Sequence, residues 1–266
     1  MKSRFLLCAL CLATGVVRAG VYVETVDRDS STGKSVPAER WYVQDGKARI
    51  EGPDGISIFK DDIVYGVDSA TKSYHVMDKA TMERLRDHLK RVREQRTQAE
   101  LAKLPPDKRA GVQEMLDKQT AATSKKPLID AKDTGKTETI NSRTCQVWDI
   151  TRDGALDEQY CIASFSTLPG GSEIQAVMQK YQGFFEQMAE LAGPGAEGDA
   201  MRDQFALWQK LNGYPLAARP YSASNIDPNE TIVKTWQSQN VPASMFEIPA
   251  NYTKRDLLKD LGGAGQ

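Results

Sequence analysis

The fold is decided by residues 40–51, which read RWYVQDGKARIE. Two runs, Arg40–Gln44 and Lys47–Glu51, flank Asp45-Gly46, and Asp-Gly between such runs is the strongest short signal for a β-hairpin. The neighbouring sequence also reads as short strands separated by turn residues. These strands are Val21–Val23, Ile56–Phe59, Ile63–Val67 and Ser73–Met77. Residues 20–78 therefore predict an antiparallel meander with one buried face and one wet face.

The apolar residues change their period after residue 78. A stripe that recurs every three or four positions predicts a helix over residues 79–103. Its members are Met82, Leu85, Leu89 and Val92. Pro105-Pro106 cannot continue this helix, so a second helix over residues 107–118 is expected to fold back on it. The sequence thus predicts a helical hairpin insertion over 79–118, followed by a polar linker over 119–136.

The first helix of this hairpin is rich in basic side chains outside its apolar stripe. Arg84, Arg86, Arg91 and Arg93 are the candidate contacts for a partner or membrane surface. Two interpretations remain open. The charges can form a solvated helix face, or they can form a patch that approaches anionic lipid headgroups or an acidic envelope protein.

Strands are predicted again at 137–151 and 156–166, on either side of Arg152-Asp153-Gly154. A three-residue loop there would place Cys145 opposite Cys161, whereas a two-residue Asp153-Gly154 turn would shift the register by one. Opposed cysteines have the separation that a disulfide needs. In the first register one face, interpreted as the inner one, carries Trp148, Ile150, Leu156, Tyr160 and Ile162.

Two covering helices are predicted within residues 172–212, the second over 199–212. They are followed by strands at about 214–224 and 231–240 and by a polar C-terminal tail, 252–266. The expected fold class is α+β: one curved antiparallel sheet, an incomplete β-barrel, covered by helices and interrupted by the charged hairpin. Residues 20–251 are expected to form a single domain, because pairing the two strand-rich halves would cover an exposed sheet edge.

The N-terminus has the pattern of a cleaved secretory signal peptide over residues 1–19. Lys2 and Arg4 precede the uncharged stretch Phe5–Val17, and Val17-Arg18-Ala19 fits a small-residue cleavage site near Ala19. Removal of three basic residues leaves 35 − 3 = 32 basic against 36 acidic side chains, a net charge of −4. The expectation is a periplasmic protein that binds no nucleic acid and has no transmembrane segment in its mature chain.

Few side chains of this sequence could support catalysis. There is no nucleophile-elbow, zinc-protease or phosphate-loop motif in the 266 residues. Of the two histidines, His88 reads as a surface residue and His75 as a packed strand residue. Cys145 and Cys161, the only cysteines beyond the signal, are expected to form a disulfide. We therefore expect a protein that is not an enzyme and has neither a cofactor nor a metal site.

The covering helices concentrate flexible thioethers and large aromatic rings. Such a mixture can repack around an irregular apolar ligand, or it can simply form the core beneath the helices. With the inner strand face, these helices supply the candidate lining of an apolar cavity. The residues are Trp148, Ile150, Tyr160, Met178, Tyr181, Phe185, Met188, Phe205 and Trp208.

The order of several short motifs resembles an uncharacterised bacterial periplasmic family related to the outer-membrane lipoprotein carriers (LolA/LolB-like). The motifs are Trp41–Glu51, Lys72-Ser73-Tyr74, Leu104–Ala110, Thr144-Cys145 with Trp148, and Phe246–Tyr252. The resemblance implies a LolA-like half-barrel whose apolar concavity binds or carries a lipid or a lipidated protein. The alternative is a non-catalytic interaction scaffold that docks on an envelope protein through the basic hairpin.

Overall fold

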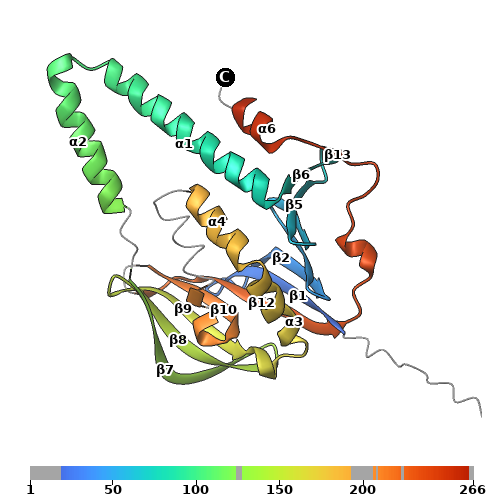
Figure 1. Ribbon diagram of the computed structural model, residues 1–266. Helices are drawn as coiled ribbons and strands as arrows, with labels where there is room; N and C mark the ends of the chain where they lie inside the picture. Colours follow the sequence, from blue (N-terminus) through green and yellow to red (C-terminus); the bar gives the residue numbers. More distant parts are fainter. Residues whose placement is uncertain (1–18, 124–127, 193–205, 208, 223–224, 264–266) are drawn as a thin grey trace, which may run out of the picture.

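The computed structural model describes residues 19–123, 128–192, 206–207, 209–222 and 225–263. The fold is α+β, with one large, open and mostly antiparallel sheet (Figure 1). From edge to edge the strands are β13 (Thr253–Lys254), β6 (Ser73–Met77), β5 (Ile63–Asp68), β4 (Gly55–Lys60), β3 (Lys47–Gly52), β2 (Ser35–Gln44), β1 (Gly20–Asp29), β12 (Asn229–Gln239), β10 (Gly213–Ser222), β9 (Ala155–Ser164), β8 (Arg143–Arg152) and β7 (Ile129–Ile140). The short strand β11 (Asn225–Ile226) pairs only with β10. The edges β13 and β7 do not meet.

The N-terminal meander follows the predicted hairpin. Asp45 and Gly46 both have positive φ, 52° and 67°, and join β2 to β3 with Gln44 paired to Lys47. This two-residue turn matches the right-handed twist of its strands. Strand β1 begins at Gly20, directly after the predicted cleavage position, and lies between β2 and β12. The two strand-rich halves are therefore parts of one sheet.

The helical insertion is longer than the sequence predicted. Helix α1 (Lys79–Ala102) begins at Asp78, whose side chain accepts a hydrogen bond from the Thr81 amide at 2.7 Å. Helix α2 (Pro106–Thr123) continues into the stretch that we interpreted as linker, and β7 begins at Ile129. The expected linker over 119–136 is therefore wrong at both ends. Strand β7 lies at the edge of the sheet and has no buried residue. Its polar sequence therefore has no alternating apolar pattern from which a strand could be predicted.

The second half also differs from prediction in its register. The expected strand 137–151 is two strands, because Asn141 and Ser142 form a turn with positive φ. A two-residue turn at Asp153-Gly154 joins β8 to β9, and a bulge at Ile150/Thr151 then places Val147 opposite Cys161. Cys145 is thus not directly opposite Cys161. The two nevertheless form a disulfide with a Cα–Cα distance of 5.2 Å.

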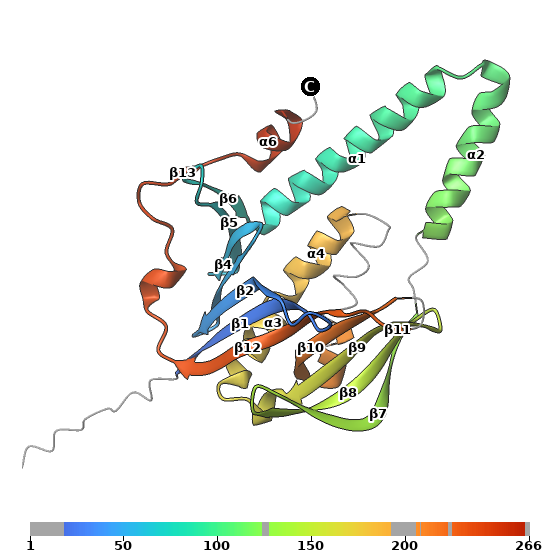
Figure 2. The same cartoon turned by 180° about the vertical axis from the view of Figure 1, so that it is seen from behind.

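Two sets of elements cover the two faces of the sheet (Figure 2). Helices α3 (Gly171–Lys180) and α4 (Gln182–Ala192) lie on one face, where the Phe59 ring contacts the Tyr181 ring at 5.1 Å. Ile58, the neighbour of Phe59, points to the other face and packs with Val241 and Phe246 from the chain after β12. We call the first of these the helix-covered face.

The C-terminal segment is more ordered than the expected polar tail. Strand β13 pairs with β6 in parallel, and helix α6 (Leu257–Gly263) follows it. Asp260 of α6 lies 2.7 Å from Nε2 of His75 on β6. The parallel strand and this contact hold the C-terminal segment on the edge of the sheet.

Candidate functional site: a groove on the helix-covered face

A row of directly paired residues crosses the helix-covered face. Its members are Trp236, Val23, Trp41, Ile50, Ser57, Gly66 and His75. Residues that oppose each other across strands share a face. The small side chains of Ser57 and Gly66 lie between the larger ones of Ile50 and His75. They leave a hollow of about 350 Å³ above β3, β4, β5 and β6.

A second hollow, of about 380 Å³, continues the first toward β9 and β10. Aromatic side chains form part of its wall: Trp41, Tyr160 and Tyr214. The Trp41 and Tyr214 rings meet edge to face, with centroids 6.3 Å apart. Both hollows share Glu39, Pro53 and Asp54 in their walls. We call the two together the groove. Its size is in the range of small-molecule sites.

The charged side chains of the groove are acidic. Asp27, Glu39, Asp54, Asp68 and Glu158 line it, and the described lining residues include no lysine or arginine. Because charges of one sign fill the site, an anionic headgroup would be repelled from it. Hydroxyl, amide or ammonium groups would instead find acceptors there.

Two of these carboxylates are held in position by aromatic donors. The Trp41 indole Nε1 donates to Glu39 Oε2 at 2.7 Å, and the Tyr160 hydroxyl donates to Glu158. Burial raises the pKa of Glu158 above its ordinary value, and the hydrogen bond from Tyr160 only partly opposes this. Burial and the nearby Glu158 in turn raise the pKa of Tyr160. The groove thus combines aromatic surface with a partly desolvated carboxyl group.

The predicted cavity residues divide into three groups. Tyr160 lines the groove, and Trp148, half-buried, is its direct partner on β8. Ile150, Met178 and Tyr181 are buried in the main apolar cluster, against which Phe185 packs. Met188 is half-buried on α4, and Phe205 and Trp208 lie outside the described residues.

Leu156 and Ile162, which we expect to share the inner face, differ in their burial. Ile162 is buried, whereas Leu156 is 43% exposed, because the two-residue turn pairs Leu156 with Thr151 instead of Ile150 and the bulge that follows pairs Ile150 with Glu158. Residues beneath the helices pack on one another: the Phe59 ring also contacts the rings of Phe184 and Phe185. Met178, Tyr181 and Phe185 line neither of the two hollows that form the groove.

The basic residues of the hairpin lie on α1 as predicted. Arg84 donates to the Thr81 hydroxyl at 3.2 Å, and Arg86 is 3.8 Å from Asp87. Arg91 and Arg93 are exposed. His88 is half-buried on the same helix, whereas His75 contacts Asp260. In the part of the chain that the structure describes, no group of metal-ligating side chains is found.

A helix that could cross a membrane is not found among the described residues, since none is both long enough and apolar enough. No family model matches the chain, and no curated protein matches it. The chain is similar to a solved structure, the crystal structure of an uncharacterized conserved protein from Thermus thermophilus. The similarity covers 90% of this chain and 92% of that one, with 6% identity and a TM-score of 0.41. A likeness at that level carries no argument about function.

Proposed function

We propose that this protein is a non-catalytic, exported binding protein that holds the apolar chain of a lipid or lipidated partner in the groove. One observation carries the proposal. Two open hollows with shared walls run across one face of the sheet, from His75 to Tyr214, and the rings of Trp41, Tyr160 and Tyr214 line the second of them. An elongated site of this kind suits an extended chain, and it needs no catalytic group.

The energetics of an apolar chain fit such a site. Each methylene removed from water gains roughly 0.8 kcal/mol. Rings such as Trp41, Tyr160 and Tyr214 offer large apolar surfaces at little cost in conformational entropy, because they are already fixed by the core. The groove therefore provides binding energy mainly through contact area.

The acidic walls narrow the class of ligand. A free fatty acid would bring its carboxylate toward Glu39, Asp54 and Glu158, which repel it. An esterified or amide-linked chain has no such charge at that end, and an amide N–H can donate hydrogen bonds to these carboxylates. The proposal therefore favours a neutral or cationic lipid, or a protein-attached acyl chain, as the ligand.

Export to the periplasm is part of the proposal. The predicted signal peptide ends where β1 begins, and Cys145 and Cys161 are joined in the way that an oxidising compartment permits. The similarity of the motifs to LolA/LolB-like carriers favours the same compartment and the same class of cargo.

Native mass spectrometry of the gently purified protein, with extraction of bound lipid, tests the proposal. The preparation should contain an acyl species, and an uncharged fluorescent lipid should bind and be displaced by it. Ala218, half-buried in the groove wall, can be changed to Phe to fill the second hollow. Ala155, exposed at the turn after β8, provides the control Ala155→Phe.

We expect Ala218→Phe to lose lipid binding while near-ultraviolet circular dichroism stays that of the wild type, and Ala155→Phe to bind normally. Ser57→Leu, which fills the first hollow, gives a second test should Ala218→Phe not fold. A lipid-free protein that binds no uncharged lipid probe would overturn the proposal. Equal binding by all folded variants would also do so.

A further inference from the structure

The middle of α1 carries a second surface, with a chemistry unlike that of the groove. We define the basic arm as residues 84–96 of α1. It contains six basic residues and two acidic ones, a net charge of +4. The remainder of residues 20–266 then has 32 − 6 = 26 basic and 36 − 2 = 34 acidic side chains, a net charge of −8. The molecule is therefore strongly polarised along this helix.

The base of α1 is anchored to the sheet, and its outer part is not. Met82 and Leu85 are buried, where α1 packs against β6 and α4. From Lys90 to Arg96 every side chain is exposed. Helix α1 extends away from the sheet in both views, and α2 runs back from its outer end (Figures 1 and 2). At 1.5 Å per residue, α1 is about 36 Å long, so its outer half is held well clear of the groove.

Several charges of the basic arm have no counter-ion among the described residues. Lys90 and Glu94 are 4.0 Å apart and both largely exposed, an arrangement that contributes little. The hydrogen bond from Lys103 lowers the pKa of Glu100, one turn after Arg96, and the charge of Arg96 adds a smaller effect. Within the ranges that the structure covers, Arg91, Arg93 and Arg96 nevertheless form no ion pair. These three guanidinium groups are therefore available to an outside anion.

The basic arm also offers little of the apolar surface on which protein partners usually dock. Val92, 43% exposed, is its one large exposed hydrophobic residue among those described. Stable protein interfaces need a buried cluster of aromatic or aliphatic residues at their centre. Attraction to a charged lipid surface needs only the charges, because each Lys or Arg near the headgroups adds to it.

We propose that the basic arm binds anionic phospholipid headgroups and holds the protein at a membrane surface. The contact is electrostatic adsorption without insertion, because Leu85 of the arm's apolar stripe is buried against the body of the protein and only Leu89 and Val92 remain. The arm and the groove are separate sites, so this inference does not depend on the proposed ligand of the groove.

Flotation with phosphatidylcholine vesicles, prepared with and without phosphatidylglycerol, tests the proposal. The wild-type protein should float with the anionic vesicles at about 50 mM salt and be released at about 500 mM, where the screening length is far shorter. The variant Arg91→Gln/Arg93→Gln/Arg96→Gln should partition on the order of 100-fold less. These side chains are exposed, so folding is expected to be unchanged.

A matched control removes three basic charges from the body of the protein. Lys34, Lys132 and Lys136 are exposed, and none has an ion pair among the described residues. Their triple Gln variant has the same net charge as the arm variant and should float like the wild type. Equal loss by both variants would overturn the proposal, since net charge alone would then explain the binding.

Two further outcomes would also overturn it. Absence of wild-type binding to anionic vesicles at low salt is one. The other is retention on immobilised polyglutamate without binding to vesicles, which would assign the arm to an acidic protein surface instead. Ala218→Phe should bind vesicles normally, and so separates a failure of the arm from a failure of the groove.

Discussion

Two glutamates of the sheet, Glu230 and Glu158, are shielded from water but have different hydrogen-bond partners. Glu230 on β12, 5% exposed, accepts hydrogen bonds from Arg28 Nε at 2.9 Å and Arg219 Nε at 2.8 Å. Glu158 on β9, in the wall of the groove, accepts a hydrogen bond from the neutral Tyr160 hydroxyl. The charge of Glu230 is compensated by two cations in direct contact. Glu158 lines the groove and has an uncharged hydrogen-bond donor.

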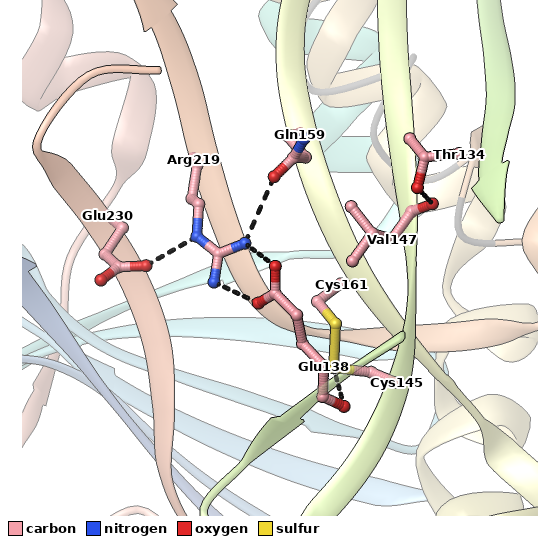
Figure 3. Close-up of a disulfide and its surroundings, with 8 residues drawn as sticks. All are labelled: Thr134, Glu138, Cys145, Val147, Gln159, Cys161, Arg219 and Glu230. Atoms are coloured by element: carbon pink, nitrogen blue, oxygen red, sulfur yellow. Dashed lines mark hydrogen bonds and ion pairs between the residues drawn. A yellow bond between two sulfur atoms is a disulfide. The ribbon is translucent and has the colours of Figure 1, made fainter. Parts of the chain in front are cut away.

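The environment of Glu230 has the features of a structural network (Figure 3). Arg219 also binds both carboxylate oxygens of Glu138 on β7, at 2.7 and 3.1 Å, so one guanidinium ties together three strands of the sheet. Burial alone would raise the pKa of Glu230, but the hydrogen bonds from Arg219 and Arg28 lower it. We infer that the network of Arg219, Glu230 and Glu138 stabilises the fold, whereas Glu158 remains accessible to a ligand in the groove.

The largest expected effect comes from breaking the Arg219 network. Arg219→Met should destabilise the protein by about 3 kcal/mol, the low end for breaking a buried pair, because Glu138 loses its cation and Glu230 keeps only Arg28. Urea unfolding measures this loss. The matched change Lys234→Met removes an exposed pair with Glu24 and should cost less than about 1 kcal/mol. Similar costs for the two variants would show that the network contributes no more than a surface pair.

Removing the disulfide should have an effect of similar size. It joins β8 to β9 beside the network, and the double variant Cys145→Ala/Cys161→Ala should lose roughly 3 kcal/mol in urea unfolding. A reductant should lower the stability of the wild-type protein by a similar amount and leave the double variant unchanged. If reduction has no effect on the wild type, the bridge does not stabilise this part of the sheet.

The smallest effects are changes in pH dependence, and they should have opposite signs. The lowered pKa of Glu230 means that its contribution is present above the ordinary carboxyl range and is lost as pH falls. The raised pKa of Glu158 means that its contribution is present at low pH and is lost as pH rises through that pKa. Urea midpoints of Glu158→Gln and Glu230→Gln between about pH 2 and 8, a range that extends below the ordinary carboxyl pKa, should therefore change slope in opposite directions. Equal changes of slope for the two variants would contradict the opposite pKa shifts of Glu158 and Glu230.

The hairpins were predictable from sequence, and the registers beyond them only in part. Asp45-Gly46 fixes Gln44 opposite Lys47 and hence Trp41 opposite Ile50, so one pair of the groove row follows from this turn. The other pairs need the turn between Gly52 and Gly55, the turns at Asp61-Asp62 and Lys72, and the pairing of β1 with β2 and β12. No strong turn motif announces the positive φ values at Asp61, Asp62 and Lys72. Asp153-Gly154 was recognised, but the bulge at Ile150/Thr151 then moved the register by one more residue.

The helix stripes predicted burial correctly but not the open site. Met178 and Tyr181 are buried as their spacing indicates, yet the break at Tyr181, which divides the expected helix into α3 and α4, has no proline or glycine at that position. Glu39, Asp54 and Glu158 come together only through strand pairing over long sequence separations. Periodicity describes which face of an element is apolar, and it carries no information about which strands become neighbours.

The pairing of β1 with β12 has a consequence for biogenesis. Gly20 pairs with Gln239, so the first strand of the chain can pair fully only after one of the last has been synthesised. If the protein is exported as proposed, β1 presents an open edge until residues 229–239 have crossed the membrane, and the centre of the sheet is incomplete. The join between the two halves of the sheet, β1 with β12, can therefore close only near the end of that passage.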